Sequence, residues 1–260
     1  MGLFEKLFGR KKVFSTQSSE TRMWQSSHDT DFFPACKCLE AQYDHGVFHE
    51  LAFHSEEQNT TCEGWKKLLE LIDAAAVSRA TEFSPGLQMP LEHWSQIITL
   101  PRTIAKLTSL RKFYLYGSHL VRIPPEIGEL ANLEELDLYT SYRLHWMPFE
   151  ITRCSKLTKT RFSTRALYGN YKYRPPFPKL ASATKYINGF LKNCSVCRND
   201  FKPGSQIQVW ISLKVGNDVL PLLVNACSEK CVKALPSSAE NYVDGSHGGG
   251  FDLEQPPRIK

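Results

Sequence analysis

Between positions 123 and 138 the chain reads Ile123-Pro-Pro-Glu-Ile-Gly-Glu-Leu-Ala-Asn-Leu-Glu-Glu-Leu-Asp-Leu138. The same spacing of apolar residues begins 23 positions earlier, at Leu100, and 24 positions later, at Met147. In each copy a proline follows the first apolar residue, and an isoleucine stands three positions after that proline. A nearly constant period of this length predicts a solenoid, because each unit buries its apolar face only against its neighbours.

Each copy ends in a short alternating segment that predicts a β-strand. In the first copy, Phe113 and Leu115 are expected to face the core, so the residues between and beside them face outward. Parallel strands stacked about 4.8 Å apart place equivalent residues of the three copies in columns. We therefore expect a partner-binding face made of Lys112, Tyr114, Tyr116, Glu135, Asp137, Tyr139, Lys159 and Arg161.

The charges on this face permit two interpretations. The columns Lys112–Glu135–Lys159 and Tyr114–Asp137–Arg161 carry charges of both signs, which could belong to a concave recognition surface with an aromatic centre. The same charges could instead satisfy one another between strands, each pair contributing under about 1 kcal/mol. The tyrosines are the stronger candidates for partner contacts, because a tyrosine presents rigid area at low entropic cost.

The three copies resemble leucine-rich repeats over about residues 98 to 170, and the form at 123–133 is especially similar to the cytoplasmic variety found in bacteria and plants. The resemblance implies an α/β solenoid of about three parallel-strand rungs that recognises another protein. The backbone-bonding asparagine of that family is replaced by Ser118, Ser141 and Arg165, so we expect an irregular third rung. Cys154 stands at a core leucine position and is predicted to be buried.

The segments around the repeats predict caps for the two ends of the array. Thr60-x-x-Glu63 is a capping box before an amphipathic helix that ends near Ala80, and Leu91 and Trp94 indicate a second, short helix. Residues 168–180 combine prolines with aromatics, which favours a cap over the last rung. The expected organisation is a basic and polar tail and linker (1–31), a helical cap (32–97), repeats with their C-terminal cap (98–180), a four-cysteine module (181–236) and a disordered tail (237–260).

Four cysteines stand in two tight pairs, Cys194-Ser-Val-Cys197 and Cys227-Ser-Glu-Lys-Cys231. The residues between the pairs predict a hairpin, with strands at 207–213 and 219–224 and a turn at 216–218. One pair at each end of a hairpin can converge on a single tetrahedral Zn²⁺, and four thiolates leave no open position, so the site would be structural. The sequence after the first pair resembles the knuckle of treble-clef and zinc-ribbon modules.

Two other interpretations of the cysteines remain open. The quartet could be four buried thiols without a ligand, whereas a redox Cys-x-x-Cys is disfavoured because no βαβ pattern surrounds Cys194. A second group could hold a metal, although its spacing fits no strong template; its members are Cys36, Cys38 and Cys62 with His45, His49 or His54.

Composition and motifs favour a binding protein over an enzyme. The chain of 260 residues carries a mild net charge of +5, and its sequence holds no phosphate loop, nucleophile elbow or His-Glu-x-x-His motif. The alternative function is nucleic-acid binding through the zinc module and the aromatic, basic tract Arg165–Arg174, although the mild charge argues against it. Without a visible secretory signal or membrane span we expect a cytoplasmic protein, whose first twelve residues could contact an anionic membrane surface.

Overall fold

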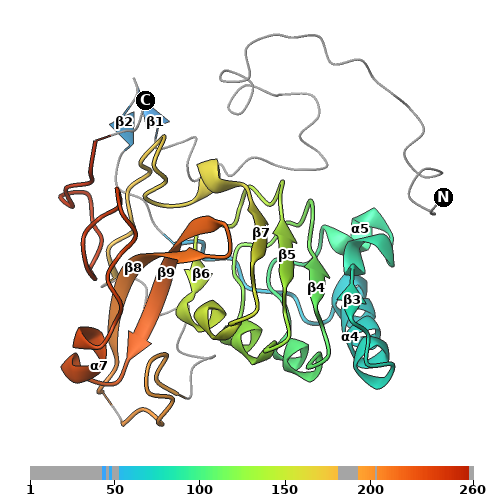
Figure 1. Ribbon diagram of the computed structural model, residues 1–260. Helices are drawn as coiled ribbons and strands as arrows, with labels where there is room; N and C mark the ends of the chain where they lie inside the picture. The colour runs from blue at the N-terminus through green and yellow to red at the C-terminus, as the bar shows by residue number, and fades with distance from the viewer. Residues whose placement is uncertain (1–42, 45–46, 49–52, 181–192, 203, 258–260) are drawn as a thin grey trace.

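The computed structural model describes residues 43–44, 47–48, 53–180, 193–202 and 204–257. Within these residues the chain has a mixed α/β fold with a parallel four-stranded sheet and a smaller mixed sheet (Figure 1). The four parallel strands, in spatial order, are β3 (Glu82–Phe83), β4 (Lys112–Tyr114), β5 (Glu135–Leu138) and β7 (Lys159–Phe162). A separate two-stranded ladder joins β1 (Tyr43–Asp44) to β2 (Val47–Phe48). The predicted membrane-contact segment and linker lie outside the described residues.

Each of the three sequence copies contributes one strand of the four-stranded sheet and one 3₁₀ helix. The helices begin directly after Pro101, Pro124 and Pro148, whose fixed backbone angle suits the start of a helix. The predicted register is confirmed, because Glu135 of β5 pairs with Lys112 on one side and with Lys159 on the other. The helices are η2 (Arg102–Lys106), η3 (Pro125–Glu129) and η4 (Phe149–Arg153).

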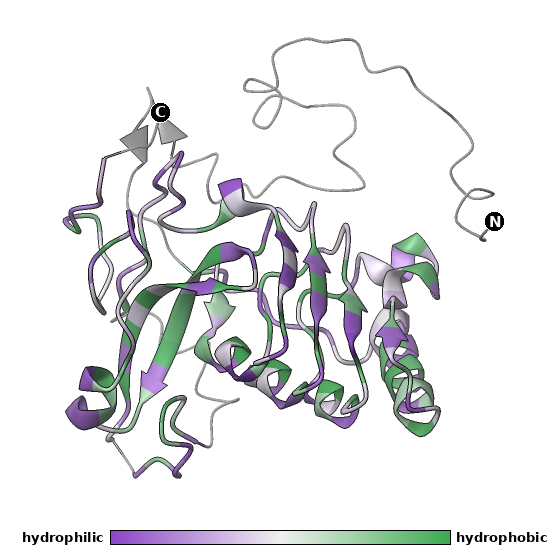
Figure 2. Cartoon of the chain, viewed as in Figure 1, coloured by the Kyte–Doolittle hydropathy of each residue, from purple (hydrophilic) through white to green (hydrophobic). Residues whose placement is uncertain are grey.

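The repeated apolar residues form a continuous core between the strands and the 3₁₀ helices. Ile104, Ile127 and Ile151, which occupy the same position in the three copies, are fully buried. Cys154 is buried as predicted, and burial raises the pKa of its thiol to about 12. Figure 2 shows hydrophilic residues along β4, β5 and β7, in keeping with an outward face opposite this core.

The expected asparagine position of each copy is filled in a different way. The buried hydroxyls of Ser118 and Ser141 lie 2.7 Å apart, and Ser141 also donates to the Leu115 carbonyl at 3.4 Å. Arg165 lies in the short helix η5 (Thr164–Ala166), where its guanidinium stacks over the Tyr173 ring instead. The serines therefore tie the first two copies together, and the third departs from that pattern as expected.

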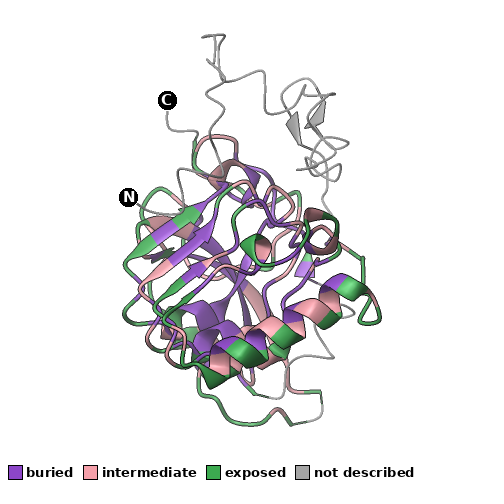
Figure 3. Cartoon of the chain, turned by 90° about the vertical axis from the view of Figure 1, so that its right-hand side faces the viewer, coloured by how far each residue is buried: buried purple, intermediate pink, exposed green. Residues whose placement is uncertain are grey.

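The N-terminal side of the array contains the two predicted helices. In Figure 3 this side faces the viewer, and the long helix shows buried positions alternating with exposed ones. Its N-cap is Cys62, whose sulfur accepts the Trp65 N–H at 3.4 Å, so the prediction of a Thr60 cap was wrong. The segment also contains β3, which the sequence did not indicate. Two residues are too short a strand to show an alternating pattern. Its helices are α4 (Glu63–Val77), η1 (Pro85–Leu87) and α5 (Leu91–Trp94).

The predicted hairpin is confirmed, but its strands are longer and it is joined to the repeats. Met147 of the third copy pairs in parallel with Leu222 of the return strand. Most buried apolar residues of the hairpin belong to the same apolar cluster as those of the repeats. The core therefore continues across the boundary that the sequence suggested between residues 180 and 181. The elements involved are β6 (Met147–Pro148), β8 (Ile207–Val215), β9 (Asp218–Ala226) and the following helix α7 (Glu229–Lys233).

The turn of the hairpin covers the outer edge of the four-stranded sheet. The Thr160 N–H of β7 donates to Oδ1 of Asn217 at 2.6 Å, and the Thr160 hydroxyl lies 2.7 Å from Oδ2 of Asp218. A Cβ on Gly216 would lie 2.7 Å from Cγ2 of Thr160, so this left-handed turn position requires glycine. The contacts explain why a threonine stands where the other copies place Phe113 and Leu136.

The C-terminal segment departs from the prediction of a disordered tail, which is wrong for residues 237–257. The backbones of Trp210 and His247 exchange two hydrogen bonds of 2.8 and 3.0 Å, and the Gly250 N–H donates to the Phe177 carbonyl at 2.8 Å. Val243 is buried. The segment has little apolar surface of its own, and it is ordered by adding to a core that other segments supply.

A second apolar cluster surrounds Trp210, and we call it the Trp210 cluster. Trp210 is fully buried, and its indole N–H donates to the Pro178 carbonyl at 3.0 Å. Tyr168 and Phe177 pack beside it, which confirms that residues 168–180 place aromatics over the end of the array. The members of the cluster come from five separate parts of the chain: Phe53, Trp146, Ala166, Tyr168, Phe177, Leu180, Trp210, Leu223 and Val243.

Candidate functional site

The four predicted ligand cysteines converge at the open end of the hairpin. Their sulfurs all lie within 4.8 Å of one another. The sulfur of Cys227 lies 3.5 Å from that of Cys197 and 3.7 Å from that of Cys231. Four thiolates about 2.3 Å from a tetrahedral Zn²⁺ lie about 3.8 Å apart. The quartet therefore has the spacing that suits a bound metal ion.

Backbone N–H groups around the first cysteine pair favour the thiolate form of Cys194. The N–H groups of Cys197 and Cys227 point at the Cys194 sulfur, at 3.5 and 3.3 Å. Burial opposes ionisation of this thiol, but these donors and the Val196 N–H outweigh it and lower the pKa of Cys194 to about 7. Arg198 closes the turn in the left-handed region with a φ of 65°. Thiolate is the form of cysteine that binds metals.

The second pair is positioned by the start of α7. The Ser228 side chain caps this helix and accepts the Cys231 N–H at 3.4 Å. Cys227 precedes the cap, so the two sulfurs lie on the same side of the first turn. Hydrogen bonds with Cys197 and then Cys231 raise the pKa of Cys227 to about 12.

The cysteine quartet is attached to the third sequence copy. Ser195 donates its N–H to the Asn225 carbonyl at 2.8 Å, and its hydroxyl accepts the Asn225 N–H at 3.0 Å. Arg153 of η4 donates to the Ser195 carbonyl at 2.9 Å. The turn that carries Cys194 and Cys197 is therefore held by β9 and by the repeats together.

The second possible metal group lies partly outside the described residues, because Cys36, Cys38, His45 and His49 have no described side chains. Cys62 caps α4, and His54 pairs with Glu56. In the part of the chain that the structure describes, only the quartet has the spacing of a metal site.

The predicted partner-binding residues lie along the outward side of the four-stranded sheet, and two of their three cations are paired. Lys112 lies 3.6 Å from Glu82, which sequence reasoning missed because it belongs to β3. Arg161 lies 3.0 Å from Asp137. Asp137 is buried, contrary to expectation, because it also accepts the Tyr139 N–H at 2.9 Å. Mutual pairing therefore accounts for part of the alternating charge.

The tyrosines of this face lie side by side. Tyr116 and Tyr139 are 52% and 44% exposed, and their ring centroids are 6.2 Å apart. The Arg161 guanidinium lies over the Tyr139 ring at 5.2 Å. Tyr114 is half-buried, and burial raises the pKa of its hydroxyl. The pair Tyr116 and Tyr139 is the exposed aromatic surface of the sheet, and we call it the tyrosine pair.

The tract Arg165–Arg174, on which the nucleic-acid alternative depends, has a partly structural role. Tyr168 is buried in the Trp210 cluster. Arg174 is also buried, and it donates to the carbonyls of Gly169 and Asn241 at 3.0 and 2.7 Å. The Tyr173 ring is flanked by cations on Arg165 and Lys172, 5.6 and 5.7 Å from its centroid.

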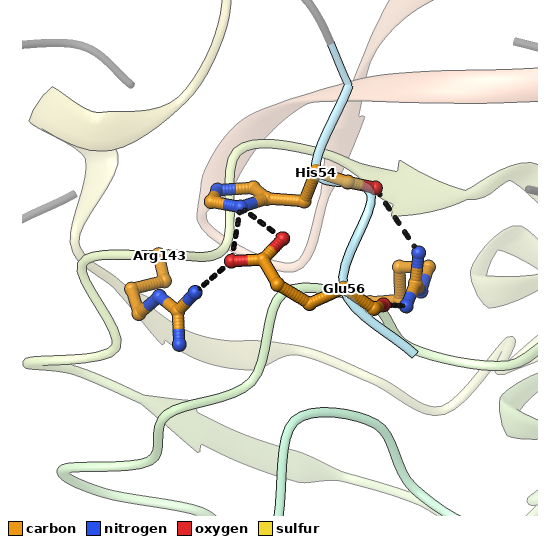
Figure 4. Close-up of polar contacts among 4 residues, drawn as sticks. His54, Glu56 and Arg143 are labelled. Atoms are coloured by element: carbon orange, nitrogen blue, oxygen red, sulfur yellow. Dashed lines mark hydrogen bonds and ion pairs between the residues drawn. The ribbon is translucent and has the colours of Figure 1, made fainter. Parts of the chain in front are cut away.

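Residues 53–59 form a strap across the repeats that no sequence pattern indicated. Figure 4 shows the Glu56 carboxylate between His54 and Arg143, and the Nδ1 atom of His54 lies 3.0 Å from that carboxylate. Arg122 donates to the backbone carbonyls of His54 and Glu56. At the far end, the Gln58 side chain accepts the Ile98 N–H at 2.8 Å. The strap thus links the Trp210 cluster, through Phe53, to the first copy.

From two buried histidines, His145 and His247, we predict that the protein loses stability in mild acid. Burial lowers the pKa of His145 to about 3 and that of His247 to about 4, so both stay neutral in the folded state. In the unfolded chain a histidine gains its proton near pH 6.5, so stability is present above that pH and is lost as the pH falls below it. Between pH 7.5 and 5.5 we expect a loss of about 1.4 kcal/mol for each histidine. Urea unfolding at the two pH values measures it.

A single substitution tests this prediction. His145→Phe should remove part of the pH dependence, because it removes one buried histidine and leaves His247 and His54, whose pKa values burial also lowers. Equal pH dependence in His145→Phe and in the wild type would contradict the assignment.

Comparison with known proteins places the chain in no family: no protein-family model matches it, and no curated protein matches its sequence. Its interpretation therefore depends on the residues and their geometry. Among the described residues, no helix has the length and apolar character needed to cross a bilayer.

Proposed function

We propose that the chain is a non-enzymatic protein-recognition module of the leucine-rich-repeat type, and that it binds its partner on the outward face of the four-stranded sheet. The observation that carries this proposal is the tyrosine pair, exposed just beyond the ends of the adjacent strands β4 and β5, whose register is fixed by the core. Each copy supplies one strand of the four-stranded sheet and one 3₁₀ helix, an arrangement that supports a short solenoid.

The chemistry of the face favours a protein as the partner. Exposed tyrosines contribute strongly to protein interfaces, because the ring buries a large area and the hydroxyl can still form a hydrogen bond. The neighbouring charges of Lys112 and Arg161 already have partners within the fold, so their contribution to affinity is smaller.

We propose further that the cysteine quartet holds one structural Zn²⁺. Cys194, Cys197, Cys227 and Cys231 would supply all four ligands, and the ion would crosslink the two ends of the hairpin. A reducing cytoplasm suits this proposal, because the ligands have to remain thiolates.

Substitution of the tyrosine pair tests the recognition face. Tyr116→Ala/Tyr139→Ala should reduce capture of the partner from nuclease-treated native lysate at least tenfold, about 1.4 kcal/mol, because two central aromatic contacts are lost. Quantitative mass spectrometry of the captured proteins measures the change.

The matched control removes two apolar side chains that are exposed elsewhere. Leu87→Ala/Phe251→Ala should capture the partner as well as the wild type, since these residues are 67% and 57% exposed and lie outside the sheet. Equal loss in the two double variants would refute the assignment of the face. Capture of nucleic acid alone, abolished by nuclease, would favour the nucleic-acid alternative.

A further inference from the structure

The four sulfurs of the cysteine quartet differ in their access to solvent. Cys197 is exposed and Cys227 is half-buried, whereas Cys194 and Cys231 are buried. An oxidant that diffuses through water therefore meets the Cys197 sulfur first. Because the oxidation of cysteine follows exposure and thiolate character, this sulfur is the expected point of attack within the quartet.

The two other described cysteines are less open to an oxidant. Cys154 is buried in the core of the repeats, and its thiol donates to the Ile127 carbonyl at 3.2 Å. Cys62 is half-buried, and its thiol donates to the Asn59 carbonyl at 3.1 Å while its sulfur accepts the Trp65 N–H. Among the described cysteines, the sulfur of the quartet that faces solvent is therefore the most accessible one.

A second sulfur stands close enough to Cys197 to complete a disulfide. Sγ of Cys227 lies 3.5 Å from Sγ of Cys197. A disulfide bond is about 2.05 Å long, so the two sulfurs have to approach each other by about 1.5 Å. Cys227 lies between the end of β9 at Ala226 and the start of α7 at Glu229, and Cys197 lies in a turn. The movement therefore takes place outside the sheet.

These two cysteines come from opposite ends of the hairpin. Cys197 belongs to the first cysteine pair, before β8, and Cys227 belongs to the second, after β9. A disulfide between them would join the same two segments that the metal ion joins. A disulfide between Cys194 and Cys197, or between Cys227 and Cys231, would close one turn and leave the ends of the hairpin apart.

We propose that Cys197 is an oxidation site, at which a peroxide releases the zinc ion and forms a disulfide between Cys197 and Cys227. The inference rests on the proposed function, because it starts from the zinc ion assigned to the quartet. The two ligands that remain after oxidation, Cys194 and Cys231, are too few for a structural zinc site, which takes four.

The reaction balances with hydrogen peroxide as the oxidant. The Cys197 thiolate attacks one peroxide oxygen, the O–O bond breaks and hydroxide leaves, which produces a sulfenic acid. The Cys227 thiolate then attacks the Cys197 sulfur, so that the S–S bond forms, the S–O bond breaks and a second hydroxide leaves. Two thiolates lose two electrons, one peroxide molecule is reduced to two hydroxide ions, and Zn²⁺ leaves without a change of charge.

Peroxide treatment of the zinc-loaded full chain tests the inference. At about 1 mM hydrogen peroxide we expect the release of about one zinc ion per chain, measured with a colorimetric chelator. Peptide mapping by mass spectrometry without reductant should show a disulfide between Cys197 and Cys227 that forms in step with zinc release. Dithiothreitol with added zinc should reverse both changes, because a disulfide is reduced by thiols.

A matched variant and a second measurement complete the experiment. Cys62→Ser should release zinc at the wild-type rate, because this cysteine lies outside the quartet. The oxidised protein should unfold at a higher urea concentration than reduced protein freed of metal by a chelator, since the disulfide keeps the ends of the hairpin joined.

Three outcomes would overturn the inference and leave the structural zinc in place: zinc that stays bound in peroxide, zinc release without the disulfide between Cys197 and Cys227, or a disulfide within one cysteine pair. A purified wild-type chain without zinc would refute the metal assignment itself, and the inference with it.

Discussion

Replacement of Cys231 with serine is expected to abolish zinc binding and to lower the free energy of unfolding by at least about 5 kcal/mol, because structural zinc contributes roughly 10–16 kcal/mol in small zinc-binding peptides. One ligand lost from four leaves a weaker site with an open position. Elemental analysis should give about one zinc per wild-type chain and none in the variant. Guanidinium unfolding followed by circular dichroism measures the change in stability.

The effect should extend from the hairpin into the repeats. Hydrogen bonds between Ser195 and Asn225 hold the turn of Cys194 and Cys197 on β9, and Arg153 connects this turn to η4. Hydrogen exchange should therefore show faster exchange in β9 and β7 of the Cys231→Ser variant, while α4 keeps its protection. A variant that exchanges faster only within residues 193–202 would show instead that the hairpin end is independent of the repeats.

Cys62 offers the matched control for the same chemistry. It lies outside the quartet and caps α4 with its sulfur, a role that serine fills well. Cys62→Ser should keep one zinc per chain and stability within about 0.5 kcal/mol of the wild type. A wild-type protein that folds fully in a chelator and contains no zinc would refute the metal assignment.

Replacement of Trp210 with alanine is expected to lower the free energy of unfolding by about 3–5 kcal/mol, because it opens a large cavity in a packed core. The ring is fully buried and contacts Phe53, Trp146, Tyr168 and Phe177. The indole N–H also donates to the Pro178 carbonyl, so the variant leaves a buried acceptor without its donor. Urea unfolding at pH 7.5 measures the loss.

Phe251→Ala is the control for this change. Phe251 is 57% exposed and lies on the same C-terminal segment, so its loss should cost less than about 0.5 kcal/mol. Limited proteolysis adds a second measurement, since residues 237–257 depend on His247 and its hydrogen bonds to Trp210. If Trp210→Ala left both stability and proteolysis of this segment unchanged, the Trp210 cluster would not be what holds the segment.

Periodic signals explain which parts of the fold could be predicted. The repeated apolar residues such as Ile127 place the strands in register, because their burial fixes which residues face outward. The cysteine pairs indicated the quartet because their spacing around a hairpin brings four sulfurs to one point. In both cases the information is local or repeats at a constant interval.

The contacts that sequence reasoning missed have no period and join distant residues. The pairing of Met147 with Leu222 adds β6 to the hairpin, and Arg143 reaches back to Glu56 on the strap. Asp137 was expected to be exposed, and its burial follows from a hydrogen bond to the backbone of Tyr139. Single polar contacts of this kind leave no pattern in the sequence, because any residue of suitable length could form them.

The contact between Gly216 and Thr160 also limits how long the stack of strands can grow. A fifth strand would have to bond to the edge of β7 that faces away from β5, where Asn217 already accepts the Thr160 N–H. A copy inserted after Phe162 would therefore have to displace the hairpin, whose buried side chains close this side of the apolar core. The same obstruction prevents a second molecule from continuing the sheet end to end, so the hairpin acts as a terminator against fibre formation.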